Sequence, residues 1–299
     1  MAIHEPPDDR SQPGGYAEEP FFFESAVHRL FGVLHSPHRA GQPLPIPPRG
    51  VVLCSPLAEE KGIAHRPLVL FARFLASHGF HVFRFDYRGT GDSQGDFEET
   101  TLSACLTDTA RAVQVLRERA GVERPMLLGL RLGGTVAALA AGADPSLGPV
   151  VLWEPVTDPR SYYDQFFRMA VVAEQLRTGG AGRTREDLAR DLADGRAVDV
   201  LGFILGAQAY REFSGVELIP ERLGAGPTLV LGLGRSPKPR PELEALAEAH
   251  RRRGGAAEVI QVPERPFWGD PNNAVREIAS WWGHEGLFGR TLAWFEAAV

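Results

Sequence analysis

Short apolar runs alternate along the chain with longer segments whose apolar residues recur every three or four positions. The runs at 50–56, 81–86, 125–130, 149–154, 227–233 and 257–262 are typical of buried strands, and the segments at 66–78, 101–120, 241–252 and 272–282 are typical of helices. Residues 21–25 and 29–35 predict two edge strands of a meander. We therefore expect an α/β fold in which a mostly parallel central sheet carries helices on both faces.

Three regions depart from this alternation. Residues 1–20 are rich in Pro, Gly, Asp and Glu and are expected to be disordered, which leaves residues 21–299 as a single domain. Residues 157–222 are arginine-rich and helical in pattern, and they predict a helical cap inserted into that domain. The apolar tail 284–299 is expected either to pack on its own domain or to form a homodimer contact.

Composition excludes several classes of function. The net charge is −6 and the longest basic run is 251–253, so no nucleic-acid partner is expected. Cys54 and Cys105 form neither a disulfide framework nor a metal-ligand pattern. No apolar run reaches the ~18 residues of a transmembrane helix and no signal-peptide pattern occurs, which predicts a cytoplasmic protein. No metal, nucleotide or other cofactor is expected, because no motif for one is present.

The stretch 126–137 carries the main chemical signal. A buried run ends in Gly129-Leu130-Arg131-Leu132-Gly133 and continues into small and apolar residues. The spacing G-x-X-x-G between a strand and a helix is that of a nucleophile elbow, a strained turn that projects its central side chain above the sheet. That central residue is usually serine, and here it is Arg131.

The chain resembles the α/β hydrolases over about residues 21–283. The segments 56–60 (PLAEE), 86–93 (DYRGTGDS), 129–133 (GLRLG), 152–156 (LWEPV) and 266–268 (PFW) carry the resemblance. Within that superfamily it is similar to the serine-aminopeptidase-like group, and more narrowly to the hydrolase 2 proteins associated with exosortase A systems. The resemblance implies an α/β-hydrolase fold, ester or acyl hydrolysis, and a bacterial setting in exopolysaccharide or envelope export.

A hydrolase of this fold needs a nucleophile at the elbow, an acid after a late strand and a histidine after the last strand. A guanidinium has no lone pair with which to attack, so Arg131 cannot replace the serine. No carboxylate occurs in 234–237 and no histidine in 263–268. Glu154 is the alternative acid, and His284 is interpreted as a surface residue. Ser55 is interpreted as a turn former and His65 as a loop residue. The sequence thus predicts a chain without the Ser-His-Asp triad.

Arg131 should lie at the sheet edge, partly out of water, and should therefore have a carboxylate partner. Glu59, Glu60 and Glu154 are the candidates, since all follow strands that end at that edge. One interpretation is an ion pair that closes the former active site, and another is that Arg131 holds an anionic ligand. The residues expected to contact a ligand are Leu57, Glu59, Glu60, Arg131, Leu132, Glu154 and Trp268.

Three hypotheses of function follow from these residues. The favoured one is a non-hydrolytic protein that binds a small anionic or acyl ligand, or a partner protein, in the former active-site cleft. The second is an esterase, acyl hydrolase or acyl transferase that uses atypical residues. The third is a scaffold or interaction protein, a hypothesis that rests on the acidic start and the apolar tail of the chain.

Overall fold

The computed structural model describes residues 15–38, 46–180, 182–218, 222–269 and 286–298. The helix expected at 272–282 and His284 lie outside the described residues, as do residues 1–14 of the segment expected to be disordered. The remainder of that segment, residues 15–20, is instead part of strand β1 (Gly15–Ser25), whose backbone pairs with β2 (His28–His38) along its whole length. Pairing to a neighbouring strand outweighs the polar composition of these residues.

An eight-stranded sheet forms the centre of the molecule, in the order β1-β2-β4-β3-β5-β6-β9-β10. The β1–β2 and β2–β4 pairs are antiparallel and the other pairs are parallel, so the predicted meander lies at one edge. The remaining strands are β3 (Arg49–Cys54), β4 (Phe80–Phe85), β5 (Met126–Leu130), β6 (Val150–Trp153), β9 (Thr228–Leu233) and β10 (Ala257–Val262).

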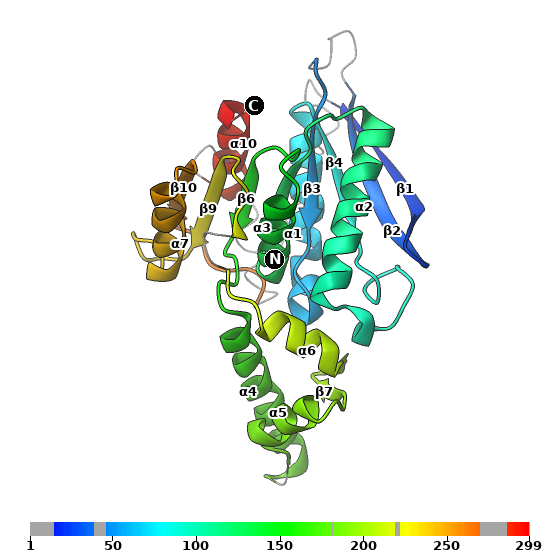
Figure 1. The fold of residues 1–299 in the computed structure, drawn as a ribbon, viewed down its shortest axis with the longest axis vertical. Coiled ribbons are helices and arrows are strands. Elements are labelled where there is room, and N and C mark those ends of the chain that lie inside the picture. Colours follow the sequence, from blue (N-terminus) through cyan, green and yellow to red (C-terminus); the bar gives the residue numbers. More distant parts are fainter. Residues whose placement is uncertain (1–14, 39–45, 181, 219–221, 270–285, 299) are drawn as a thin grey trace, which may run out of the picture.

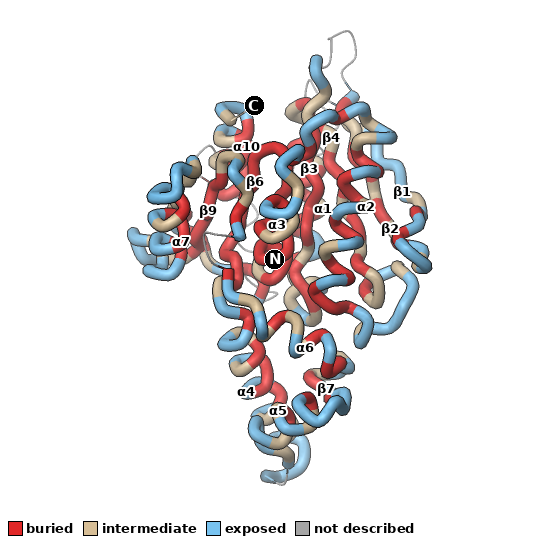
Figure 2. The backbone as a smooth tube through the Cα atoms, in the orientation of Figure 1, coloured by how far each residue is buried: buried red, intermediate tan, exposed pale blue. Residues whose placement is uncertain are grey.

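Helices cover both faces of this sheet, as the alternation predicts (Figure 1). Alternate residues of the parallel strands enter two separate apolar clusters. One cluster includes residues of α2 (Leu102–Ala120), α3 (Leu132–Ala143) and α7 (Pro241–Arg252), and the other includes residues of α1 (Ala58–Ser77) and α10 (Leu287–Ala298). Strands buried on both faces are continuously apolar, which is why they read as short runs in the sequence (Figure 2).

Residues between β6 and β9 form a lobe at one end of the molecule (Figure 1). The lobe contains α4 (Pro159–Thr178), α5 (Arg185–Ala193), α6 (Ala207–Ser214) and a hairpin of β7 (Val198–Val200) and β8 (Phe203–Leu205). The segment expected to form a helical cap thus contains, in its described part, three helices and, in addition, a hairpin that the sequence did not predict. Leu201 (φ 56°) and Gly202 (φ 87°) both have positive φ, which is the turn geometry that matches the twist of paired strands.

Helix α1 begins earlier than the sequence predicts. The expected helix begins at residue 66, but α1 already begins at Ala58 and continues through Pro67. Gly62 and Pro67 weaken the helical pattern, but Glu59 and Glu60 suit the positive end of the helix dipole. The early start places Glu60 on a rigid element instead of a loop.

No described helix combines the length and the apolar character that crossing a membrane requires. The described His, Cys, Asp and Glu side chains form no group of three that could hold a metal ion.

Candidate functional site

Arg131 occupies a strained turn between β5 and α3. Its backbone has φ 56° and ψ −122°, a conformation that costs energy for any residue with a side chain. Two glycines make the turn sterically possible. A Cβ at Gly129 would lie 2.2 Å from the carbonyl oxygen of Gly133, and a Cβ at Gly133 would lie 2.1 Å from the carbonyl oxygen of Cys54. The backbone thus has the geometry expected of a nucleophile elbow, with arginine at its tip.

The guanidinium of Arg131 forms an ion pair with Glu60. Arg131 Nε donates to Glu60 Oε1 at 3.1 Å, and Nη1 donates to the backbone oxygen of Glu154 at 3.4 Å. The side chains of Arg131 and Glu60 are 14% and 15% exposed, so the pair is largely out of water. Because both charges are shielded from solvent, each requires the other.

Two aromatic rings enclose the same guanidinium. The ring centres of Tyr162 and Trp268 lie 5.6 Å and 5.2 Å from the Arg131 Cζ atom, within the range of cation–π contacts. Tyr162 comes from α4 of the lobe, and Trp268 follows β10. The cation at the elbow is therefore held from the sheet, from α1 and from the lobe together.

Burial dominates the electrostatics of Glu60. It raises the pKa of this carboxyl above the usual glutamate value, although Arg131 and the Tyr162 hydroxyl act in the opposite direction. Oε2 is buried and has no hydrogen-bond partner of good geometry among the described residues. Burial likewise raises the pKa of Tyr162 well above its usual range, so its hydroxyl stays protonated.

The other two candidate partners do not pair with Arg131. Glu154 has φ 44° and is buried, and its Oε1 accepts a hydrogen bond from the backbone N–H of Leu233 at 2.6 Å. Its second oxygen forms an ion pair with Arg240. Burial raises the pKa of Glu154, with Arg240 opposing the shift. Glu59 is exposed and does not form an ion pair with Arg131. Of the three candidates, only Glu60 offers its carboxylate to the elbow.

An apolar pocket lies beside the elbow, between the sheet edge and the lobe. Leu57 at the start of α1 and Leu132 at the start of α3 contribute two of its walls, and the lobe supplies most of the others. About 280 Å³ is free of protein atoms when the open solvent at its mouth is included. The pocket is lined by Leu57, Ala58, Phe97, Leu132, Tyr162, Tyr163, Phe166, Phe203 and Leu205.

The positions expected for an acid and a histidine hold other groups. After β9, the backbone oxygen of Gly234 accepts a hydrogen bond from Gln261. After β10, the buried Glu264 accepts a hydrogen bond from the backbone N–H of Leu287. No histidine occurs between β10 and Gly269, the last described residue before the gap at 270–285.

Sequence reasoning missed Tyr162 and Arg240, which complete the site. Tyr162 lies 31 positions beyond Arg131 in the chain, and nothing in its sequence neighbourhood indicates that its ring meets the elbow. Arg240 precedes the predicted helix 241–252, where a basic residue is typical of a solvated surface. Only the packing of the lobe and the strand order bring the two residues to this edge.

Comparison with known proteins agrees with the geometry. A family model described as serine aminopeptidase, S33, matches residues 46–188. The uncharacterized protein YfhR of Salmonella typhi is 42% identical over 81 residues, which are 26% of this chain and 26% of that protein. The aligned segment thus spans about a quarter of the length of this relative.

Solved structures are similar over most of the chain. Est1E of Butyrivibrio proteoclasticus, solved with ferulic acid bound, has a TM-score of 0.57 at 16% identity and covers 87% of this chain and 98% of its own. An esterase of Pyrococcus furiosus has a TM-score of 0.60 at 13% identity and covers 95% and 91%. The chain has the α/β-hydrolase fold, as predicted, and the family match over residues 46–188 supports the superfamily.

Proposed function

We propose that this α/β-hydrolase-fold protein is non-hydrolytic and uses the former active-site cleft to bind a ligand. The Arg131–Glu60 ion pair is the observation that carries the proposal. Arg131 stands where a serine nucleophile would stand, and its charge is already neutralised by Glu60. This favours a structural role of Arg131 over the capture of an anionic ligand at the elbow.

The groups around the elbow support the same conclusion. Glu154, the alternative acid, is bonded to Leu233 and Arg240 and points to no described histidine. A nucleophile, base and orienting acid must lie within hydrogen-bonding reach of one another to form an acyl-enzyme. Arg131 belongs to no such set of groups. Ester hydrolysis at the elbow therefore lacks a nucleophile.

Turnover of p-nitrophenyl acetate and butyrate tests this proposal. We expect the pure protein to hydrolyse neither ester above the uncatalysed rate, and Arg131→Ala to behave identically. A fluorophosphonate probe should leave the protein unlabelled, because no serine is activated. Hydrolysis that vanishes in Arg131→Ala would overturn the proposal, and probe labelling would favour an atypical esterase or acyl transferase.

We infer further that the ligand carries an apolar acyl or aromatic group. The pocket beside the elbow is lined by aliphatic and aromatic side chains, and apolar walls with few polar groups are typical of small-molecule sites. Tyr162 lies between this pocket and Arg131, whose charge is already neutralised by Glu60, so the pocket offers contact area rather than charge.

Titration calorimetry with octanoate and with octanol tests this inference. Both should bind, because apolar contact rather than the carboxylate supplies the affinity. Phe203→Ala removes one wall and should weaken binding about tenfold, which corresponds to the ~1.4 kcal/mol of a partly lost apolar contact. Ile204→Ala is the matched control, since Ile204 is the exposed neighbour on the same strand. Binding of octanoate alone would contradict the inference.

We also propose that the chain belongs with the hydrolase 2 proteins of exosortase A systems and acts in the cytoplasm in exopolysaccharide or envelope export. The segments 56–60, 86–93 and 266–268 support this assignment. Deletion of the gene in its bacterium should reduce exported polysaccharide, and the gene encoding Arg131→Ala should restore export at least in part. Unchanged export after deletion would contradict the assignment.

A further inference from the structure

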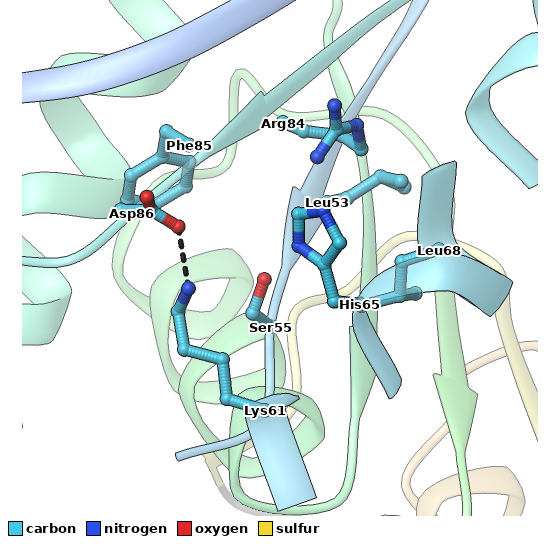
Figure 3. A pocket seen from close by; sticks show the side chains of 8 residues that line it. All are labelled: Leu53, Ser55, Lys61, His65, Leu68, Arg84, Phe85 and Asp86. Atoms are coloured by element: carbon cyan, nitrogen blue, oxygen red, sulfur yellow. Dashed lines mark hydrogen bonds and ion pairs between the residues drawn. The ribbon is translucent and has the colours of Figure 1, made fainter. Parts of the chain in front are cut away.

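A second hollow lies at the carboxyl ends of β3 and β4 and shares no lining residue with the apolar pocket. Figure 3 shows polar side chains from three segments pointing toward one another around it. About 300 Å³ around it is free of protein atoms when the open solvent at its mouth is included. The hollow is lined by Leu53, Ser55, Lys61, His65, Leu68, Arg84, Phe85 and Asp86.

Positive charge exceeds negative charge around this hollow. Lys61 Nζ donates to Asp86 Oδ1 at 2.6 Å, so these two charges compensate each other. The other oxygen of Asp86 accepts the backbone N–H of Asp92 at 3.1 Å. Arg84 is left with no carboxylate of its own, and the hollow carries a net charge of about one positive unit before His65 is protonated.

Arg84 itself has a neutral partner. Its Nε donates to the buried Nε2 of His35 at 3.0 Å, and none of the described carboxylates forms an ion pair with it. A guanidinium that is half out of water without an anion is costly. Its remaining N–H groups form the planar fork that binds phosphate and carboxylate groups.

Two uncommitted groups complete the ring of donors. The hydroxyl of Ser55 forms no hydrogen bond with any described residue. His65 points its ring toward Arg84 in Figure 3 and likewise has no hydrogen-bonded side-chain partner in the described parts of the chain. Donors therefore approach the centre from three directions: from the residue that follows β3, from α1 and from β4.

We propose that this hollow binds a compact tetrahedral oxyanion, a sulfate or phosphate group, between Arg84, His65 and Ser55, with Lys61 at its rim. Donors from three directions suit a tetrahedral anion better than a planar carboxylate. The site is separate from the elbow and does not depend on whether Arg131 is catalytic. It would give the protein a second ligand, or hold the charged end of a larger phosphorylated or sulfated one.

The pKa of His65 should depend on whether an anion is bound in the hollow. Partial burial of its ring, followed by the positive charges of Arg84 and Lys61, lowers its pKa, whereas Asp86 and Asp92 oppose the shift. A bound dianion adds negative charge beside the ring and must raise the pKa of His65. The same linkage requires the anion to bind more tightly as pH falls and His65 takes up its proton.

The test follows the His65 ring by NMR in the full chain while pH is varied. Sulfate is compared with chloride at equal ionic strength, because sulfate keeps its charge where histidine titrates. We expect sulfate to raise the pKa of His65 and to leave His81, at the start of β4, unchanged. His65→Gln assigns the signal. Identical titrations of His65 in sulfate and chloride would overturn the proposal.

Variants then locate the site. Arg84→Gln should weaken sulfate binding about tenfold, as expected for loss of a charge-assisted pair. Ser55→Ala should weaken it about threefold, and it keeps the proposal testable if Arg84→Gln does not fold. Arg252→Gln, exposed on α7, is the matched control and should bind normally. Normal sulfate binding by both Arg84→Gln and Ser55→Ala would overturn the assignment.

The choice of anion is tested in the same way. Inorganic phosphate should act like sulfate, because it has the same shape and a similar charge. Acetate at equal ionic strength should raise the pKa of His65 much less. An acetate effect as large as that of sulfate would overturn the tetrahedral assignment and show that the hollow takes carboxylates.

Discussion

At the residue scale, breaking the ion pair between Arg131 and Glu60 should lower the free energy of unfolding by a measurable amount. Glu60→Gln leaves the largely buried guanidinium without a counter-charge. Loss of one partner of a fully buried pair costs about 3–5 kcal/mol, and partial exposure of this pair reduces the expected loss to about 1–3 kcal/mol. Urea unfolding measures the free energy of unfolding in both proteins.

Glu59→Gln is the matched control for that experiment. Glu59 is the neighbouring carboxylate in the same helical turn, but it is exposed and does not pair with Arg131. We expect its replacement to change the free energy of unfolding by less than about 0.5 kcal/mol. Equal losses of unfolding free energy in the two variants would show that Glu60 stabilises the protein through the helix dipole and not through the ion pair.

His35 makes the stability of the fold depend on pH. Its side chain is fully buried, and burial followed by the charge of Arg84 lowers its pKa to about 4. The unfolded chain takes up this proton near the usual histidine pKa, whereas the folded protein resists it. Stability is therefore complete above that value and falls as pH falls, by about 2 kcal/mol between pH 7.5 and 5.

Replacing His35 isolates its contribution from those of other titrating groups. His35→Gln keeps an acceptor for Arg84 but cannot take up a proton. We expect the variant to be less stable at pH 7.5, because packing is disturbed, yet to lose less stability on acidification. Urea unfolding at pH 7.5, 6 and 5 gives the comparison, and an unchanged pH dependence would exclude His35 as its source.

At the element scale, the turn from β5 into α3 depends on close approach to β3. In Gly133→Ala the new Cβ would lie 2.1 Å from the carbonyl oxygen of Cys54, so a strand must shift. We expect a loss of about 3 kcal/mol in the free energy of unfolding, the upper part of the range for overpacked sites. Thermal and urea unfolding measure it.

Gly62→Ala is the opposite case within a helix. A Cβ at Gly62 meets no atom within 4 Å, and alanine is favoured over glycine in a helix by about 1 kcal/mol. This variant should therefore gain stability. A loss in Gly62→Ala, or no loss in Gly133→Ala, would contradict the packing described for these two helices.

The same two helices show how far sequence predicts elements and site. The elbow was predictable because its glycine spacing is local, and Glu60 was one of three candidate partners because its segment follows a strand ending at the same edge. The start of α1 was not, since Gly62 and Pro67 interrupt the periodicity. The hairpin at Leu201 was missed because positive φ at a leucine is decided by its surroundings.

At the scale of the whole molecule, α10 closes the core instead of offering a free surface. Phe288 is fully buried, with its ring 5.0 Å from that of Phe71 and stacked 6.1 Å from that of Trp153. Trp153 Nε1 also donates to Thr291 at 3.1 Å. This packing on its own domain weakens the hypothesis of a scaffold protein that presents an apolar tail.

Phe288→Ala tests whether the tail belongs to the cooperative unit. Removing a fully buried phenylalanine should cost about 3–5 kcal/mol of the free energy of unfolding. Glu296→Ala, exposed on the same helix, is the control and should be nearly neutral. If urea unfolding gives similar values for the two variants, α10 melts separately from the sheet.

The architecture of the molecule could be predicted from the sequence, but two of the residues that form its site could not. Alternating strands and helices specify the sheet because each apolar run must be covered on both faces. Tyr162 and Arg240 meet the elbow only through the docking of the lobe and the order of strands. Contacts of that kind depend on the whole fold, and no local sequence pattern predicts them.

The strained turn at Arg131 also bears on where a thiol-reactive label could be attached to this protein. Cys54 and Cys105 are buried, and burial raises the pKa of Cys54 to about 11, so neither thiol should react with alkylating reagents in the folded state. A cysteine placed at 131 would be held by the same backbone at the mouth of the cleft. A fluorophore at position 131 would therefore respond to what enters the neighbouring pocket, although attaching it removes the ion pair with Glu60 and the associated stability.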